Sequence, residues 1–263
     1  MTSDSKQKPT KISVPAENRA EGDVDRLVYN RFFRNSAGGV LVEVGAARPD
    51  YLSISAYFRQ INWKVISIEP NPAYQDYYSK AGISVLQYAV DNRDEDDVDF
   101  TVVNADLASY RDGNVTFESW SSLSIKEEYG KLKNDLNTST IKVKVRKLNT
   151  ILKQHAPEIE SIDLICIDIE GWELEALASL NFGKFRPKVL IVENLFQEDK
   201  YRLFMRERGY TLWRSVHPNE IYVLKDMLSA SEWLYGAIQS SAVTAFWRGR
   251  RALGKIIKLK SSR

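Results

Sequence analysis

The 263-residue sequence predicts an α/β fold in which a mostly parallel β-sheet is covered by helices on both faces. Three observations support this prediction. Short, nearly continuous apolar runs rich in valine and isoleucine recur along the chain, as in strands that are buried on both faces. Amphipathic segments of helical length alternate with these runs, as in βαβ units. The runs end at glycine, proline or an acidic residue, where a strand gives way to a loop.

Each element follows from the same patterns. The buried strands of the sheet are predicted over residues 40–45, 64–72, 83–90, 162–168 and 188–194. A closing pair of strands, the last of them antiparallel, is predicted over residues 210–216 and 220–225. Alternating polar and apolar residues predict extra antiparallel strands, between the third and fourth core strands, over residues 98–103 and 141–148. Helical spacing predicts helices over residues 23–35, 53–60, 73–81, 148–155, 173–179 and 199–208.

Length and composition limit the classes of protein that remain. A chain with 43% hydrophobic residues can form one well-packed domain with extensions. The net charge of +2 does not indicate a particular partner. The single cysteine, Cys166, excludes a disulfide framework and favours a reducing compartment, so we expect a cytoplasmic protein. No apolar run approaches the roughly 20 residues that a membrane-spanning helix needs.

Acidic residues follow most of the predicted strands. In open parallel sheets, ligands bind beyond the carboxyl ends of the strands. Acids that gather at one edge repel each other unless a cation, a hydroxyl-rich ligand or backbone N–H groups meet them. The predicted strand ends therefore form a candidate ligand site, and they carry Glu43 and Gly45, Glu69, Ala89-Val90-Asp91, Asp168, and Glu193-Asn194.

The first two strand ends predict the kind of cofactor. The sequence has neither G-x-G-x-x-G nor G-x-x-x-x-G-K-[ST], so the cradles of dinucleotide and nucleoside triphosphate enzymes are missing. Glu69, about 25 residues after the first strand, is placed to accept hydrogen bonds from both hydroxyls of a ribose. A glycine turn with such an acid suits an adenosyl ligand without a pyrophosphate, of which S-adenosylmethionine is the commonest. The alternatives are a simple strand-ending turn at Gly45 and a helix N-terminal acid at Glu69.

With its later motifs, the chain resembles the FkbM-type S-adenosylmethionine-dependent methyltransferases. The motifs are VEVGA (42–46), VISIEPNP (65–72), QYAVDNRD (87–94), SSLS (121–124), KVKVRKLNTIL (142–152), IDLICIDIEGWELEAL (162–177) and VLIVEN (189–194). The sixth motif, similar to the family's KIDVEGAE, is the most specific. Two departures stand out: Arg48-Pro49-Asp50 occupies the position of the usual second glycine, and Trp172 replaces a small residue.

The resemblance implies a class I Rossmann-like methyltransferase fold with a seven-stranded sheet. It also implies O-methyl transfer to a hydroxylated small molecule, expected to be a sugar or glycoconjugate, a lipid-linked glycan included. Backbone groups of the Ala89-Val90 turn would pair with adenine. The residues expected to surround S-adenosylmethionine are Glu43, Gly45, Ala46, Glu69, Pro70, Asn71, Ala89, Val90 and Asp168.

A hydroxyl acceptor needs a base or a metal ion to take or weaken its proton. Asp168 ends the fourth strand, and Glu193 and Asn194 end the fifth, which makes Glu193 a further catalytic candidate and Asn194 a candidate substrate contact. This set resembles the magnesium site of catechol-type O-methyltransferases, so Mg²⁺ bound by these three residues is one expectation. The alternative is that Asp168 or Glu170 acts directly as a base or orients the acceptor. Glu170 could instead cap the helix that follows.

Further residues are expected on the acceptor side. His217 lies in the turn between the last two strands, which makes it a candidate base or acceptor contact; a solvated turn histidine is the alternative. Ser121 and Ser122 belong to a polar segment that would close over the site, with an ordinary polar loop as the alternative. Trp172 is expected in the acceptor wall because sugars stack on aromatic faces, although aromatic residues are more often core.

The two ends of the chain differ from the domain of residues 23–226. Residues 1–22 are polar and predicted to be flexible, and residues 227–263 are predicted to form a basic helical extension. This extension has apolar residues at helical spacing, so it is a candidate for peripheral contact with the inner membrane surface or another subunit. The alternative is a helix packed on the domain with a frayed basic tail.

Two other functions stay open at this point. A protein could keep this fold and bind S-adenosylmethionine without turnover, but intact Glu69, Asp168 and Glu170 argue against that reading. A nucleic-acid methyltransferase could use the basic tail as its binding arm. The chain lacks an N-P-P-[YFW] motif and its core is not basic, so no nucleic-acid partner is expected.

Overall fold

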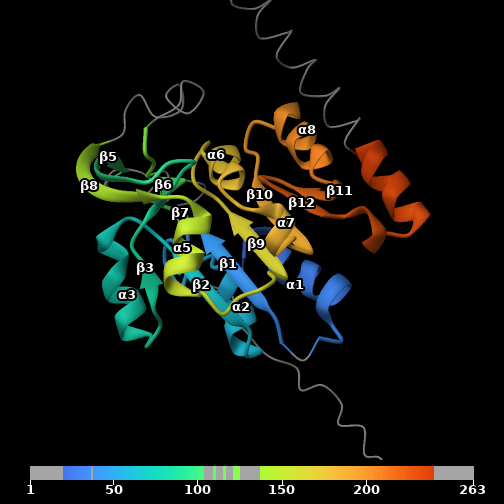
Figure 1. Ribbon diagram of the computed structural model, residues 1–263, viewed down its shortest axis with the longest axis horizontal. Coiled ribbons are helices and arrows are strands. Elements are labelled where there is room, and N and C mark those ends of the chain that lie inside the picture. Colours follow the sequence, from blue (N-terminus) through green and yellow to red (C-terminus); the bar gives the residue numbers. More distant parts are fainter. Residues whose placement is uncertain are drawn as a thin grey trace, which may run out of the picture.

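The main sheet of the protein has the predicted α/β architecture (Figure 1). The computed structural model describes residues 20–36, 38–103, 109–110, 115–116, 121–124 and 137–239. In this part of the chain a seven-stranded sheet has the order β11-β12-β10-β9-β1-β2-β3. Its strands are β1 (Val40–Val44), β2 (Lys64–Ile68), β3 (Val85–Leu86), β9 (Leu164–Ile167), β10 (Val189–Glu193), β11 (Tyr210–Val216) and β12 (Asn219–Leu224). The strand β12 runs antiparallel to both of its neighbours, β10 and β11, which confirms the predicted antiparallel last strand.

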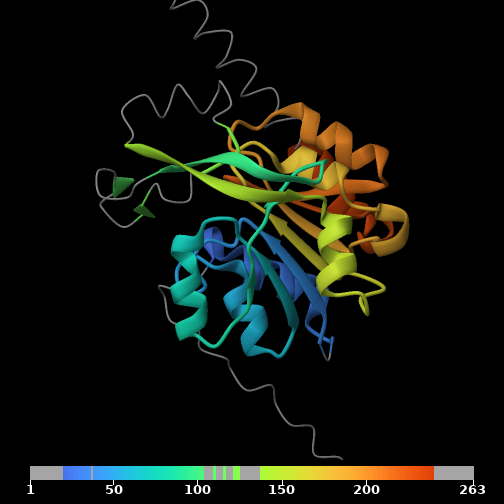
Figure 2. The same ribbon diagram turned by 60° about the vertical axis from the view of Figure 1, so that its left-hand side comes forward.

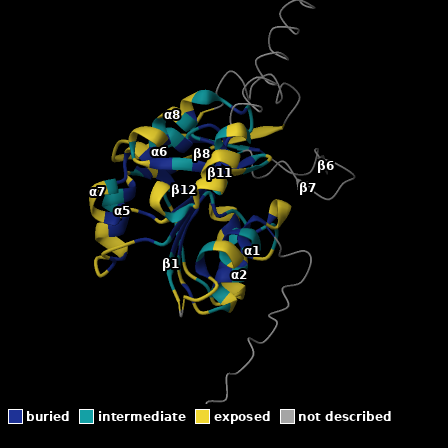
Figure 3. Ribbon diagram, turned by 90° about the vertical axis from the view of Figure 1, so that its right-hand side faces the viewer, coloured by how far each residue is buried: buried dark blue, intermediate teal, exposed yellow. Residues whose placement is uncertain are grey.

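Helices cover both faces of the sheet. Successive residues of a strand point to opposite sides, so each strand places apolar side chains on both faces. Leu41 and Leu164 pack on the side of α1 (Val24–Val28), the π-helical turn η3 (Tyr29–Phe33) and α2 (Ile54–Gln60). Val42 and Ile165 pack on the other side, which is covered by α5 (Leu148–His155), α6 (Glu173–Ala178), α7 (Phe182–Phe185) and α8 (Asp199–Glu207). Figure 3 shows the buried sheet between helices whose outer surfaces are exposed. Burial on both faces explains why the strands are almost wholly apolar.

The third predicted strand, over residues 83–90, is wrong as a single element. Val85–Leu86 pairs with β2, whereas β4 (Ala89–Val90) pairs with β8 (Thr138–Arg146) in a separate sheet of order β4-β8-β5. The backbone turns between the two pieces, where the Tyr88 N–H donates to the Leu86 carbonyl at 3.0 Å. An apolar run does not reveal a change of pairing partner within it.

The extra antiparallel strands between the third and fourth core strands are confirmed. β5 (Glu95–Val103) pairs with β8 as a long ribbon, shown in green beside the main sheet in Figure 2. Ser122 adds one antiparallel bridge to Thr101 of β5. Two short strands, β6 (Ser109–Tyr110) and β7 (Val115–Thr116), pair with each other.

The helices agree with the predicted ranges in most places. α2, α5, α6 and α8 lie within one or two residues of the predictions, while the predicted helix over 73–81 is a 3₁₀ turn, η4 (Pro72–Tyr74), followed by α3 (Gln75–Lys80). The predicted helix over 23–35 is shorter and begins with the 3₁₀ turn η2 (Glu21–Asp23). The short helix α7 was not predicted. None of the described helices is long and apolar enough to cross a membrane.

The chain continues beyond β12 through the 3₁₀ turn η7 (Lys225–Met227) into a helix over residues 230–239. This helix lies beside β11, at the red end of the chain in Figure 1. Residues 1–19 and 240–263 lie outside the described part, so most of the predicted N-terminal tail and basic extension is not described.

The turn that ends β1 is packed tightly against the end of β9. Gly45 has φ +76°, and a Cβ atom added to it would lie 1.8 Å from the carbonyl oxygen of Asp168. The Asp168 N–H also donates to the Val44 carbonyl at 3.1 Å. Glycine is therefore needed here for its backbone angle and for the approach of another segment of the chain, as well as for the turn expected from the sequence.

We expect Gly45→Ala to lower the free energy of unfolding by about 3 kcal/mol or more, because backbone strain adds to a direct clash. Gly209→Ala is a matched control: Gly209 has φ +85°, but no atom lies within 4 Å of its added Cβ. This control should lose only about 1–2 kcal/mol. Urea unfolding of both variants measures the difference, and equal losses would show that the contact with Asp168 does not constrain the turn.

Candidate functional site

A cavity of about 290 Å³ lies at the carboxyl ends of the parallel strands. It is bounded by the ends of β1, β2, β9 and β10, by β4, by the segment 121–123 and by the turn before β12. The predicted site residues that line it are Glu43, Gly45, Ala46, Glu69, Pro70, Ala89, Val90, Ser121, Ser122, Asp168, Glu170, Trp172, Glu193 and His217. Asn71 and Asn194 do not line it. The fold thus brings together residues from nearly the whole length of the domain.

Glu69 ends β2 and is held in place by backbone N–H groups. One carboxylate oxygen accepts from Ala47 N–H at 3.0 Å, and the other accepts from Asn71 N–H at 2.8 Å. Burial raises the pKa of Glu69 to about 7, against the lowering effect of these two bonds. The side chain of Asn71 accepts from Ala73 N–H at 3.0 Å and begins η4. Asn71 therefore positions Glu69 and does not itself face the cavity, contrary to the sequence expectation.

Glu43 belongs to β1, and its side chain contacts α2. Its carboxylate accepts from the backbone N–H of Ser55 at 3.1 Å and from the Ser55 hydroxyl, and the Arg59 guanidinium is 3.8 Å away. Burial raises the pKa of Glu43, and the charge of Arg59 opposes that rise. Glu43 therefore joins α2 to the sheet while contributing to the cavity wall.

The loop after β1, in which Arg48-Pro49-Asp50 occupies the position of the usual second glycine, has an uncommon backbone conformation. Ala47 and Leu52 have positive φ angles of 41° and 49°. The guanidinium of Arg48 lies 4.3 Å from the centre of the Tyr77 ring and pairs with Asp50 at 3.0 Å. Arg48 lines the cavity, so a cation stands at the position of the missing glycine.

The described lining is acidic. It includes six carboxyl side chains but a single guanidinium, that of Arg48. Because like charges in a confined space repel, such a lining favours a ligand that carries positive charge near the carboxylates. The six are Glu21, Glu43, Glu69, Asp168, Glu170 and Glu193.

Three of these carboxylates form a cluster. Asp168, Glu170 and Glu193 each offer an oxygen atom within 4.8 Å of the others. The side chain of Asp168 is open to the cavity but surrounded by protein atoms. Burial raises the pKa of Asp168 to about 7 and the charge of Glu173 adds to that rise, whereas a hydrogen bond with Glu193 opposes it. Asp168 is therefore poised to gain or lose a proton near neutral pH.

Glu173 is a residue whose role the sequence analysis missed. Its Oε1 accepts from the N–H groups of Ile169 at 3.1 Å and Gly171 at 2.8 Å. Its Oε2 accepts from the hydroxyl of Tyr201 at 2.6 Å. Burial raises the pKa of Glu173. Glu173 satisfies the N–H groups of Ile169 and Gly171 in the loop before α6, and its place in the first turn of a predicted helix was the available signal.

Trp172 connects the loop between β9 and α6 to the segment with Ser121 and Ser122. Its Nε1–H donates to the Ser124 carbonyl at 3.1 Å. The Ser121 hydroxyl accepts from the Val103 N–H at 3.1 Å, and this anchors the segment to β5. Trp172 and both serines line the cavity. Their role as a cover on the acceptor side stays a prediction.

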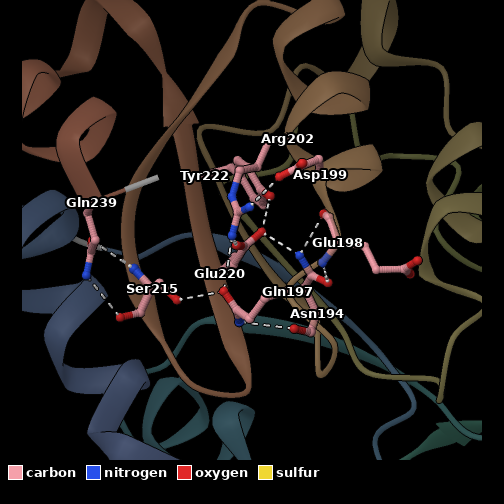
Figure 4. Close-up of polar contacts among 9 residues, drawn as sticks. All are labelled: Asn194, Gln197, Glu198, Asp199, Arg202, Ser215, Glu220, Tyr222 and Gln239. Carbon is pink, nitrogen blue, oxygen red and sulfur yellow. Dashed lines mark hydrogen bonds and ion pairs between the residues drawn. The ribbon is translucent and has the colours of Figure 1, made fainter. Parts of the chain in front are cut away.

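Asn194, which does not line the cavity, takes part in a polar network (Figure 4). Its Nδ2 donates to the Glu198 carbonyl at 3.1 Å and to Glu220 Oε2 at 3.0 Å, and its Oδ1 accepts from Glu198 N–H at 2.8 Å. The predicted roles of Asn194 in metal and substrate binding are therefore not supported, because its amide already bonds to other groups. Glu170 takes the place of Asn194 in the carboxylate cluster.

Arg202 on α8 neutralises the fully buried Glu220 at the centre of this network. Its guanidinium also donates to Asp199 at 3.1 Å and to Gln197 at 3.1 Å. The Asn194 N–H donates to the Pro218 carbonyl at 3.0 Å, beside His217 at the cavity rim. The network therefore fixes the loop after Glu193 and the turn that carries His217.

The chain matches the family model of the methyltransferase FkbM domain over residues 43–212. This range covers more than half of the chain and includes Glu43, Glu69 and the carboxylate cluster. His217 lies just beyond it. No curated protein sequence matches the chain.

We expect Arg202→Met to lower the free energy of unfolding by about 3 kcal/mol or more, because it leaves the buried Glu220 carboxylate without its cation. Lys142→Met is a matched control that breaks the pair between Lys142 and Asp99, whose side chains are 60% and 68% exposed. Exposed pairs contribute about 0–1 kcal/mol, so the control should change little. Chemical denaturation compares the two variants; a similar small loss in both would contradict a structural role for Arg202.

Proposed function

Because the chain belongs to the FkbM methyltransferase family, we propose that it transfers a methyl group from S-adenosylmethionine to a hydroxyl of a small acceptor, a sugar or glycoconjugate. One observation carries this proposal. A strand-end acid held by backbone N–H groups, Glu69, shares a cavity with the cluster of Asp168, Glu170 and Glu193. Glu69 suits the hydroxyls of a ribose, and the cluster suits an acceptor hydroxyl that must lose its proton.

The cavity lining fits an adenosyl sulfonium ligand. Two backbone N–H groups hold the carboxylate of Glu69, which leaves further lone pairs for ribose hydroxyls. Ala89 and Val90 offer a small apolar surface beside it for adenine. The acidic lining favours the positive sulfonium, and S-adenosylmethionine would supply the electrophilic methyl group when bound.

The carboxylate cluster suits the work that the acceptor requires. A group with a pKa near the working pH is the most effective general base, and burial places Asp168 there. We assign to Asp168 the removal of the acceptor proton and to Glu170 and Glu193 the orientation of the hydroxyl. His217 at the rim is a further acceptor contact. Trp172, Ser121 and Ser122 would cover the acceptor and exclude water.

A divalent ion is compatible with the same three carboxylates. Carboxylate oxygens are the ligands that Mg²⁺ prefers, and the three groups lie close enough together to share one ion. The alternative is that the cluster holds no ion and that Asp168 and Glu193 share a proton, since their side chains are close together. An activity assay with and without a chelator distinguishes the two.

Glu69→Gln should weaken S-adenosylhomocysteine binding by about tenfold to a hundredfold, the effect of losing hydrogen bonds to a charged group. In the wild type the ribose hydroxyls favour the ionised carboxylate, so binding releases a proton. Affinity should therefore rise with pH until Glu69, with a pKa of about 7, is ionised in the free protein. In Glu69→Gln this rise should be reduced. Isothermal titration calorimetry on both sides of pH 7 measures affinity and proton release.

The exposed Glu207→Gln on α8 serves as the control and should bind like the wild type. The raised pKa also has a consequence for the free protein. Burial of Glu69 favours its protonated form, so its contribution to stability is present at low pH and is lost as the pH rises through about 7. The melting-temperature shift caused by the ligand should then be larger above pH 7 than below it. Unchanged affinity in Glu69→Gln would place the ribose elsewhere.

Asp168→Asn should lower methyl transfer by about a hundredfold or more, because an amide cannot act as a base. Binding of S-adenosylhomocysteine should persist. The assay follows labelled methyl from S-adenosylmethionine into a panel of free and lipid-linked sugars, with the exposed Asp76→Asn as the control. Loss of wild-type activity in EDTA and recovery with Mg²⁺ would assign the cluster to a metal. Full activity in Asp168→Asn would exclude Asp168 from the chemistry.

A further inference from the structure

The helix over residues 230–239 is held to the domain by polar groups. The guanidinium of Arg31 donates to both carboxylate oxygens of Glu232, at 2.6 and 2.7 Å. The side-chain amide of Gln239 bonds to the backbone of Ser215 in β11, accepting from its N–H at 3.2 Å and donating to its carbonyl at 3.4 Å. These contacts fix both ends of the helix.

A glycine contact holds the middle of the helix. A Cβ atom added to Gly236 would lie 2.1 Å from the carbonyl oxygen of Leu212, so the helix backbone lies directly against β11. Glu232, Gly236 and Gln239 follow each other at spacings of four and three residues and therefore share one face of the helix. The face toward the domain is thus small and polar.

The opposite face of this helix is apolar and points to solvent. Leu234, Tyr235 and Ile238, which we call the outer face, are 54%, 56% and 59% exposed. Spacings of three and four residues place them together. A surface helix normally buries its apolar face against the core, and this helix has the reverse orientation. Neither core packing nor the contacts above account for the outer face.

The charge of the adjoining sequence indicates what would cover this face. After Glu232 the chain has no acidic residue, and it contains Arg248, Arg250, Arg251, Lys255, Lys258, Lys260 and Arg263. Basic segments are drawn to anionic lipid headgroups, and adjacent apolar side chains then insert at the boundary with the acyl chains. A second copy of the chain would add a second basic sequence and no acidic residue from beyond Glu232, so charge favours an anionic surface over that partner.

We propose that the outer face of Leu234, Tyr235 and Ile238 docks on an anionic membrane surface, with the basic sequence that follows providing the electrostatic attraction. The helix then serves as a rigid element through which the domain approaches the membrane, because Arg31 and Ser215 fix its position. This inference does not depend on the proposed acceptor, and methyl transfer to a soluble sugar would leave it unchanged.

The test is flotation of the full chain with vesicles of phosphatidylcholine, alone or mixed with phosphatidylglycerol. The chain should bind the mixed vesicles and bind phosphatidylcholine vesicles weakly, and added salt should reduce binding. The triple variant Leu234→Ser, Tyr235→Ser and Ile238→Ser should lower the partition coefficient by about tenfold or more. Its melting temperature should be unchanged, because these side chains are exposed.

Leu203→Ser is the matched control. Leu203 is 47% exposed on α8, which covers the other face of the sheet, so its removal should leave vesicle binding unchanged. Absence of binding to anionic vesicles, or equal binding by the triple variant, would overturn the proposal. A dimer in sedimentation that dissociates in the triple variant, without vesicle binding, would assign the outer face to a second copy.

Discussion

The close contact between Gly45 and the Asp168 carbonyl is the constraint on which the site depends. It joins the ends of β1 and β9, two strands that are adjacent in the sheet but far apart in the sequence. The turn after Gly45 holds the carboxylate of Glu69, and Asp168 on the other side of the contact belongs to the carboxylate cluster. A side chain at Gly45 would separate the two halves, so one packing requirement sets the distance between the cofactor side and the acceptor side.

The cavity concentrates carboxyl groups at a cost in stability. Burial raises the pKa of Glu43, Glu69, Asp168 and Glu173, which means that the folded chain disfavours their charged forms. Hydrogen bonds from backbone N–H groups offset part of this cost at Glu69 and Glu173. A positively charged ligand would offset more of it. Groups that destabilise the free protein in this way are common where binding and catalysis occur.

Several polar residues near the site support it without facing the ligand. Asn71 holds Glu69, Glu173 holds the loop with Glu170, and Asn194 joins the network of Arg202 and Glu220. In the sequence Asn71 and Asn194 resemble ligands because they lie at strand ends beside acids, whereas Glu173 stands in the first turn of a predicted helix. The side-chain partner decides between the two roles, and that partner comes from a distant segment: Tyr201 for Glu173 and Glu220 for Asn194.

The sequence by itself determined the α/β architecture, the antiparallel last strand and the position of the acidic edge, because burial of a parallel sheet imposes a local apolar pattern that can be read directly. It also placed Glu69, Asp168 and Glu193 at strand ends. Only the tertiary structure decided that residues 89–90 leave the main sheet, that Glu170 replaces Asn194 in the cluster and that the helix over 230–239 turns its apolar face outward. Those outcomes depend on pairing and packing between segments far apart in the chain, which a local pattern does not encode.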